Sequence, residues 1–292
     1  MSENIWDSKL DYLKISRKCL FNLDYMEHLI NKVWKIIKSV DIVDFGCGNG
    51  DLGMSMLPLL PDGSTYTGLD SSAVLLDSAC NAFSELSYAH QFKQVDITTY
   101  EAKQKYDIAI CRTVLQHIPD ALNVMERMKQ SVKPGGLVIC METDRNLDNA
   151  GLYFDGLDLH SFNNLGILQK LWYVQHMSGG SDHTIGTKLP AYLRKIGLKN
   201  IGVRISDYVQ FLNPDDEQVK HTLDVAAFNV AWNTTIADEK AVIKNLISRG
   251  LSEEEAEIQV KCETEIKKYI RDNAETRSIF NPTFLIIAYG KV

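Results

Sequence analysis

Hydrophobic positions along the chain alternate between short apolar runs and stretches with helical spacing. The apolar runs predict five buried strands at 40–45, 64–69, 91–95, 106–111 and 137–142. Helical spacing predicts helices at 51–60, from just after 70 to about 86, and at 120–132, and Lys133-Pro134-Gly135-Gly136 predicts a turn. Successive strand–helix units wind right-handed and set their strands parallel, so the pattern indicates an α/β fold.

The N-terminal stretch 5–38 is predicted to be helical. Its second half carries a one-sided apolar stripe of Met26, Leu29, Ile30, Val33, Trp34 and Ile37. Asp24 and Glu27 have the spacing of a capping box, which would start this helix. We therefore expect residues 1–39 to form a helical arm in front of the first strand.

The second half of the chain has a weaker pattern. Residues 143–187 are rich in Gly and Asn, with a helix expected at 166–176, and a further helix is expected at 188–196. Two late strands, 200–212 and 283–289, are expected to form an antiparallel pair. Residues 213–281 form a helical insertion between them, in which Ser252 and Glu255 would cap a helix. The predicted units are 1–39, a core of 40–212 plus 282–292, and the insertion 213–281.

Composition and charge narrow the class of protein. The 292 residues are 45% hydrophobic and include 31 Lys and Arg against 38 Asp and Glu, a net charge of −7. An acidic balance argues against a general nucleic-acid binder. None of the six cysteines forms a C-x-x-C pair, so no zinc spacing appears, and we expect a reducing, cytoplasmic location. The N-terminus lacks the apolar core of a signal peptide, and no membrane span is expected.

The strongest chemical signal is the stretch Asp44-Phe45-Gly46-Cys47-Gly48-Asn49-Gly50. A carboxylate ends a buried strand, and three glycines then allow a sharp turn and a close approach to a ligand. The second strand ends at Asp70, where a carboxylate takes the ribose hydroxyls in nucleotide-binding α/β proteins. Asp96 ends the third strand. The three acids together predict a ligand of nucleoside type.

The order D-x-G-x-G-x-G resembles the first motif of the class I S-adenosylmethionine-dependent methyltransferases, in the small-molecule branch. It differs from the G-x-G-x-x-G of dinucleotide sites. The resemblance continues in Gly68–Ser72, Val95–Ile97, 106–120 and 133–142. It is close over 40–145 and holds only in outline from 200 to the end. It implies a Rossmann-like seven-stranded sheet with helices on both faces and an antiparallel last strand.

The resemblance also implies a role for each matched residue. Asp44 would orient the glycine turn and the amino group of the cofactor, and Asp70 would hold the ribose hydroxyls. Asp96 would accept a hydrogen bond from the adenine amino group. The remaining implied contacts are Gly46, Cys47 and Gly48 at the methionine part and ribose, Leu69, Ser71 and Ile97 at the adenine, and Arg112 and Thr113 at the methionine end.

Candidates for the acceptor side lie outside these motifs. His117 follows the fourth strand and would serve as a general base, or it would pack against the cofactor or cap a helix. Tyr12 and Arg17 would close over the methionine end, or would belong to a helix that packs on the sheet. Glu142, Asp144 and Arg145 follow the fifth strand. The insertion 213–281 would cap the acceptor pocket or form a dimer interface, and its expected partners in a roof are Tyr153, Phe154, His160, Phe162, Trp172, Tyr173 and His176.

The sequence therefore predicts a methyltransferase that moves a methyl group from S-adenosyl-L-methionine to a small organic acceptor and leaves S-adenosyl-L-homocysteine. No metal-ligand cluster appears, so a metal-independent reaction is expected. Besides the acceptor, the partner we expect is a second copy of the chain in a homodimer. We expect no nucleic acid and no membrane as partners. A protein or tRNA methyltransferase, a non-catalytic cofactor-binding protein and an NAD-dependent oxidoreductase stay open as alternatives.

Overall fold

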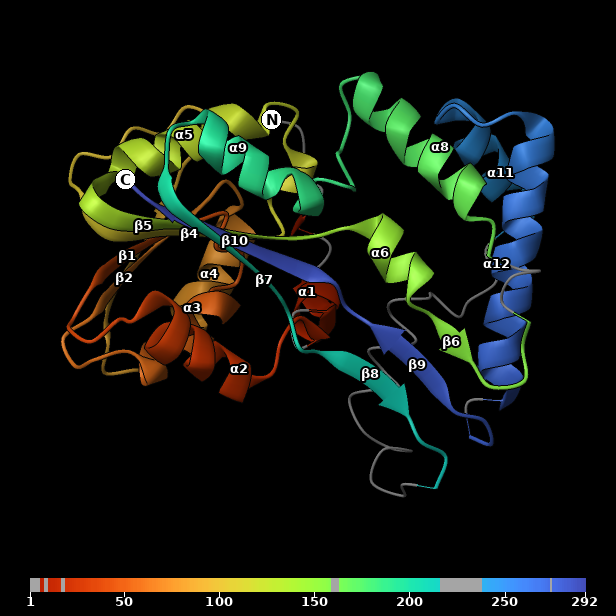
Figure 1. The fold of residues 1–292 in the computed structure, drawn as a ribbon, viewed down its shortest axis with the longest axis horizontal. Coiled ribbons are helices and arrows are strands. Elements are labelled where there is room, and N and C mark those ends of the chain that lie inside the picture. The colour runs from red at the N-terminus through yellow and green to blue at the C-terminus, as the bar shows by residue number, and fades with distance from the viewer. Residues whose placement is uncertain (1–5, 8–9, 17–18, 159–162, 216–237, 274) are drawn as a thin grey trace.

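The computed structural model describes every residue except 1–5, 8–9, 17–18, 159–162, 216–237 and 274, and its main element is a seven-stranded sheet (Figure 1). The strands are β1 Asp41–Phe45, β2 Thr65–Asp70, β3 Ala89–Gln94, β4 Tyr106–Arg112, β5 Val132–Thr143, β7 Lys199–Ile205 and β10 Leu285–Lys291. They lie in the order β3-β2-β1-β4-β5-β10-β7. Strands β1 to β5 pair in parallel, and β10 runs antiparallel to both of its neighbours. The Rossmann-like fold with an antiparallel last strand is confirmed.

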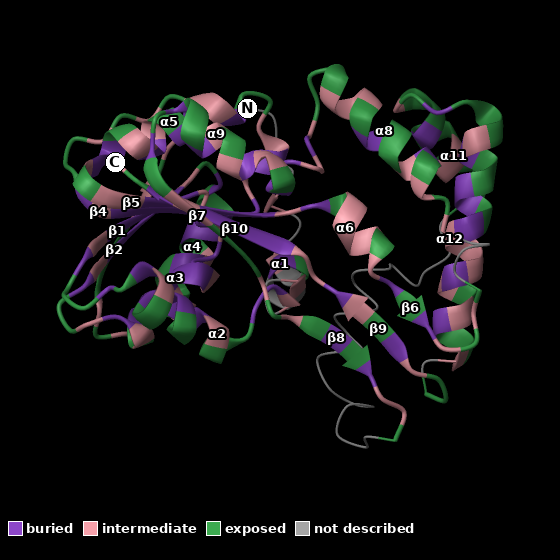
Figure 2. Ribbon diagram, viewed as in Figure 1, coloured by how far each residue is buried: buried purple, intermediate pink, exposed green. Residues whose placement is uncertain are grey.

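Helices cover both faces of this sheet because its central strands are apolar on both sides. Ile42, Val43 and Phe45 of β1 are fully buried. One face carries α2 Leu23–His28, continued by the π-helical turn Leu29–Trp34, with α3 Asp51–Met56 and α4 Ala73–Phe83. The other face carries α5 Ala121–Ser131 and α9 Leu189–Lys195. Figure 2 shows the buried residues concentrated where these helices meet the strands.

The N-terminal region differs from the single helical stretch expected over 5–38. Its first described helix is α1 Leu10–Ser16. The helix α2 has Asn22 at its N-cap position, two residues before the predicted cap Asp24. Lys35 adopts a left-handed backbone conformation with φ 55° and ends the helix. Ile37 therefore leaves the apolar stripe and is 87% exposed.

The strand predictions need two corrections. The expected turn at 133–136 lies within β5, where the pairing with β4 shifts register and Gly135 has φ 80°. The expected strand 200–212 is two strands, because β7 ends at Ile205 and β8 Val209–Leu212 joins a second sheet. That sheet has the order β6-β9-β8, with β6 Tyr153–Phe154 and β9 Ile279–Pro282.

A helical unit beside the second sheet joins segments that are far apart in the sequence. It contains α8 Leu165–Met177, α11 Glu239–Ser248 and α12 Glu253–Asn273, and α6 Arg145–Ala150 lies between it and the main sheet (Figure 1). Apolar residues of α8, α11 and α12 form one cluster, which includes Leu171, Leu246 and Val260. The capping pair predicted before α12 is confirmed, since Ser252 and Glu255 exchange hydrogen bonds of 2.8 and 3.2 Å. The division into three units stays a prediction.

Short 3-10 turns complete the fold at Leu57–Leu59, Leu115–His117 and Gly186–Lys188. Within the described part of the chain, no helix has the length and apolar character that a membrane crossing needs.

Candidate functional site

The turn after β1 brings bare backbone to the carboxyl edge of the sheet. Gly46, Gly48 and Gly50 have φ values of 78°, 54° and 79°, in the left-handed region that side chains disfavour. A Cβ atom on Gly46 would lie 2.5 Å from Cγ2 of Val114, so the close approach requires glycine as well. Below the turn, Asp44 is buried and accepts a hydrogen bond of 2.6 Å from the hydroxyl of Tyr66.

Asp70 connects this glycine turn to the next helix. Its Oδ2 accepts a hydrogen bond of 2.8 Å from the backbone N–H of Gly48, and its Oδ1 accepts one of 2.9 Å from Ser72. Ser72 in turn caps α4 by accepting from the backbone N–H of Leu75. The exposed Ser71 lies between these two anchors. The carboxylate predicted to take ribose hydroxyls is therefore held against the predicted cofactor turn.

Asp96 and Ile97 lie just beyond the end of β3. The exposed Asp96 accepts hydrogen bonds of 2.6 and 2.8 Å from the hydroxyl and backbone N–H of Thr98, and these bonds lower the pKa of its carboxyl. Ile97 is buried. The carboxyl ends of neighbouring parallel strands meet at one edge. Asp44 near the end of β1, Asp70 at the end of β2 and Asp96 just after β3 therefore lie along the same edge.

At the end of β4, Arg112 is buried and paired with Asp51, the first residue of α3, at 2.8 Å. Its guanidinium lies over the ring of Phe21 at 5.5 Å, and its buried Nη1 hydrogen-bonds none of the described residues. The next residue, Thr113, has φ 53°, a strained conformation for a β-branched residue. Strain of this kind concentrates at ligand sites, and Thr113 lines the cavity described next.

A cavity of about 390 Å³ lies beside the ends of β4 and β5. Trp6, Tyr12, Leu13, Ser16, Cys19 and Leu20 line it from the N-terminal segment, and Thr113, Gln116, His117 and Thr143 line it from the sheet edge. The rest of the described lining is Arg145, Asp148, Asn149, Leu152, His183, Gln210, Asn281, Pro282 and Thr283. The size suits a small organic molecule.

The described part of the N-terminal segment contacts both the carboxyl edge of the sheet and the cavity. The ring of Trp6 meets His117 edge-to-face at 4.9 Å, and Asp7 accepts a hydrogen bond of 2.5 Å from the hydroxyl of Ser72. Tyr12 lines the cavity, as a lid residue would. Arg17 lies outside the described residues.

The three charged residues expected after the fifth strand each have a different role. Glu142 is fully buried and accepts backbone hydrogen bonds of 2.8 and 2.7 Å from Val114 and Leu115, which fixes the loop after β4. Asp144 is buried and caps α6. Only Arg145 lines the cavity.

The cavity residues that the sequence did not single out include two with shifted pKa values, Asp148 and His183. Burial raises the pKa of Asp148 to about 6, against the positive charge of Arg145, which lowers it. Burial and the nearby charges of Arg145 and Arg249 lower the pKa of His183 to about 4, so this imidazole is neutral at physiological pH. Spacing gave no signal for either residue, because both lie in the Gly- and Asn-rich stretch 143–187.

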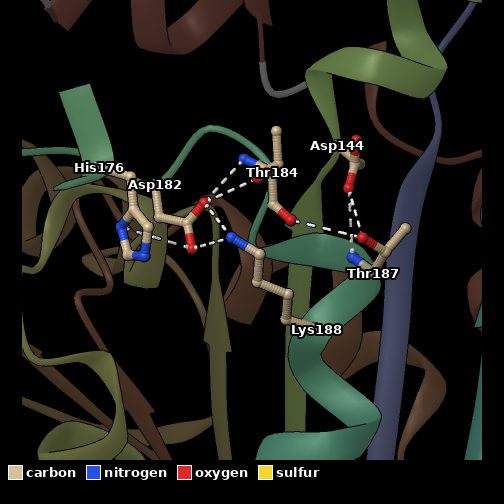
Figure 3. Close-up of polar contacts among 6 residues, drawn as sticks. All are labelled: Asp144, His176, Asp182, Thr184, Thr187 and Lys188. Carbon is tan, nitrogen blue, oxygen red and sulfur yellow. Dashed lines mark hydrogen bonds and ion pairs between the residues drawn. The ribbon is translucent and has the colours of Figure 1, made fainter. Parts of the chain in front are cut away.

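A polar network holds the loop that carries His183 (Figure 3). The buried Asp182 accepts a hydrogen bond of 2.7 Å from Lys188 and bonds of 2.9 and 3.1 Å from Thr184, and these bonds lower its pKa despite its burial. Thr187 donates a hydrogen bond of 2.7 Å to Asp144. The loop is thereby fastened to the end of β5, and His183 is fixed at the cavity wall.

The described aromatic residues of the roof expected from the stretch 147–187 do not line the cavity. Phe154 is buried against Tyr269 of α12, and Tyr153 and Tyr173 are exposed. Trp172 and His176 are also missing from the described lining, and His160 and Phe162 lie outside the described residues. From the described part of 213–281, Asn281 reaches the cavity, and no residue of α11 or α12 does.

Comparison with known proteins finds methyltransferases similar to the part of the chain that carries the motifs. Residues 43–138 match the family model described as a methyltransferase domain. The ubiquinone biosynthesis O-methyltransferase of Coxiella burnetii is 32% identical over 126 residues, which are 42% of this chain and 50% of that protein. The Salmonella typhi protein of the same name is 31% identical over 143 residues, 48% and 56% of the two chains. The chain thus spans about half the length of the curated relatives it matches.

Solved structures extend the similarity of fold to nearly the whole chain. Phosphoethanolamine N-methyltransferase 2 of Haemonchus contortus, solved with phosphomonomethylethanolamine and S-adenosylhomocysteine, superposes with a TM-score of 0.50 at 16% identity. The match covers 92% of this chain and 52% of that one. The YcgJ protein of Bacillus subtilis superposes with a TM-score of 0.50 at 14% identity and covers 92% and 98%.

Proposed function

We propose that this chain, whose residues 43–138 match a methyltransferase-domain model, transfers a methyl group from S-adenosyl-L-methionine to a small organic acceptor. The observation that carries the proposal is one shared edge of the sheet. The glycine turn, Asp70 and Asp96 lie at the carboxyl ends of adjacent parallel strands there, and Thr113, just after β4, lines the cavity.

The residues present fit such a cofactor. The glycine turn lets backbone approach a ligand, and a Cβ atom on Gly46 would clash with the side chain of Val114, so the turn would have to shift. The buried Nη1 of Arg112 lacks a partner among the described residues, as expected of a donor that awaits a carboxylate such as that of the methionine part. Asp70 would hold the ribose hydroxyls by exchanging its bond to Gly48.

The other predicted contacts keep the roles that the resemblance implies. Asp44 would support the turn, Ser71, Asp96 and Ile97 would surround the adenine, and Cys47 and Gly48 would line the methionine part. Tyr12 and Arg17 would close the methionine end. The contacts of Trp6 with His117 and of Asp7 with Ser72 support a lid formed by the N-terminal segment.

When bound, the cofactor supplies a methyl group that its sulfonium already activates for displacement. The protein then has to exclude water and hold the acceptor in line with that methyl group. Alignment of two reactants supplies up to about 7–11 kcal/mol in well-oriented cases. The cavity walls supply the alignment, and His117 stands where the cofactor edge and the cavity meet.

An acceptor with a hydroxyl group is supported by the curated relatives, which are named O-methyltransferases. The mixed apolar and polar lining, with Leu13, Leu20 and Leu152 opposite amides and charges, suits a compact organic molecule. We further propose that the enzyme is cytoplasmic and that its partner at this cavity is a small molecule. We also propose that it assembles as a homodimer and binds no nucleic acid.

Methyl transfer from tritiated S-adenosylmethionine tests the proposal. The purified chain is incubated separately with a metabolite extract, a protein extract and bulk tRNA, beside an Asp70→Ala variant. We expect label in the metabolite fraction and at least tenfold less with the variant. Label confined to protein or tRNA, or label in none of the three, would overturn the small-molecule assignment.

A further inference from the structure

One carboxylate stands among the described residues that line the cavity, and it belongs to Asp148. In the short helix α6, Arg145, Asp148 and Asn149 stand at positions i, i+3 and i+4, which share one face. All three line the cavity. The acidic group is therefore presented by the helix that directly follows the central strand β5.

The two oxygens of Asp148 have different surroundings. Oδ1 accepts a hydrogen bond of 2.9 Å from the backbone N–H of Phe284, just before β10, and this bond fixes the side chain. Oδ2 hydrogen-bonds no described residue, and it is not among the buried polar atoms that lack a partner. One oxygen is thus anchored while the other is left for a ligand.

Burial makes this carboxylate a stronger base than an ordinary aspartate. Burial raises the pKa of Asp148 to about 6, and Asp144 acts in the same direction. Arg145 and the Phe284 N–H act in the opposite direction and keep the group ionised at neutral pH. The other titratable groups that face the cavity are Tyr12, Cys19, His117 and His183. A proton acceptor works best when its pKa lies near the operating pH.

We propose that Asp148 takes the proton that the acceptor's hydroxyl group loses on methylation. The inference rests on the proposed function. The O–H bond breaks and its electron pair stays on oxygen, oxygen forms the new bond to the methyl carbon, and the carbon–sulfur bond breaks with its electron pair left on sulfur. The proton passes to Oδ2 of Asp148.

This assignment also limits the class of acceptor. A phenolic hydroxyl has a pKa of about 10, roughly four units above that of Asp148, whereas the pKa of an unactivated hydroxyl such as that of water is much higher. Proton transfer to a carboxylate is easier from the first kind as the methyl group arrives. We therefore expect the cavity to favour a phenol or a hydroxyl of similar acidity.

The histidines in the cavity are weaker candidates for this step. The pKa of His183 is lowered to about 4, below that of Asp148, and its Nδ1 is buried. His117 packs against the rings of both Trp6 and His183. Matched variants of the three residues separate their contributions.

The experiment measures transfer of tritiated methyl groups to catechol, phenol and 4-hydroxybenzoate, with benzyl alcohol as the unactivated hydroxyl. Asp148→Asn keeps the oxygen that accepts from Phe284 and removes only the base. His117→Gln and His183→Gln are compared with it, and Asp62→Asn, in an exposed turn, is the matched loss of one carboxylate. Binding of S-adenosylhomocysteine by calorimetry reports the cofactor site independently of the reaction.

We expect wild type to methylate at least one phenolic probe and not benzyl alcohol, with a kcat that falls below about pH 6. Asp148→Asn should lower kcat by about 100- to 10,000-fold. It should leave the cofactor Kd within twofold and abolish the acid limb of the pH profile. Normal kcat or an unchanged profile in Asp148→Asn, with wild type active, would overturn the role of Asp148 alone. Cofactor binding without transfer to any probe would overturn the phenolic acceptor class, and failure to bind the cofactor would overturn the proposed function itself.

Discussion

The raised pKa of Asp148 predicts a specific pH dependence of stability. A carboxyl whose pKa is raised on folding stabilises the native state most below its unfolded pKa, and that stabilisation is lost as pH rises through the folded value. For Asp148 the window runs from 3.8 to about 6. At pH 5.0 the native carboxyl is mostly protonated and the unfolded one mostly ionised, whereas at pH 7.5 both are ionised.

With an unfolded pKa of 3.8 and a folded pKa of about 6, proton linkage predicts that wild type loses about 1.4 kcal/mol of stability between pH 5.0 and 7.5. Asp148→Asn is neutral at both pH values and keeps the hydrogen bond from Phe284. Its free energy of unfolding relative to wild type should therefore rise by about 1.4 kcal/mol over that interval.

Urea unfolding at pH 5.0 and 7.5, followed by circular dichroism, measures this difference. Asp62→Asn supplies the effect of removing one negative charge from an exposed turn. A relative stability of Asp148→Asn that is the same at both pH values, or that falls between them, would refute the assignment of a buried, weakly acidic carboxyl at this position.

Two further predictions concern the cofactor edge. Gly46→Ala places a Cβ atom 2.5 Å from Cγ2 of Val114 and should weaken S-adenosylhomocysteine binding at least tenfold by calorimetry. Gly135→Ala, at a similar φ with nothing within 4 Å, is its control, and equal Kd values for the two variants would contradict the steric argument. Arg112→Ala leaves the partly exposed Asp51 without its partner and should cost about 3 kcal/mol in urea unfolding. A cost below about 1 kcal/mol would show that the pair is worth no more than a surface salt bridge.

The sequence was sufficient to predict the elements whose hydrophobic residues recur with a strict period. The buried strands around Val43, Ala109 and Ile139 alternate with helices, and this alternation predicted the main sheet and the edge that carries Asp44 and Asp70. The spacing of the glycines also predicted a sharp turn after β1, where Gly46, Gly48 and Gly50 have positive φ, since the backbone requirements of such a turn are local.

The acceptor side was predicted poorly because its residues meet only through tertiary packing. Asp148, His183 and Asn281 come from segments without shared periodicity, and the cavity brings them together. The expected strand 200–212 was read as continuous, since nothing in its apolar pattern marks the point where β8 leaves the main sheet. Aromatic residues such as Phe154 suggested a roof but serve a second core instead.

The central claim is that the carboxyl edge of the sheet binds an S-adenosyl group between the glycine turn and Asp70. Titration calorimetry of the purified chain with S-adenosylhomocysteine, and separately with NAD, tests it most directly. We predict saturable binding of S-adenosylhomocysteine at one site per chain, no binding of NAD, and loss of binding in Asp70→Ala. Absence of heat with S-adenosylhomocysteine, or equal binding by Asp70→Ala, would contradict the account.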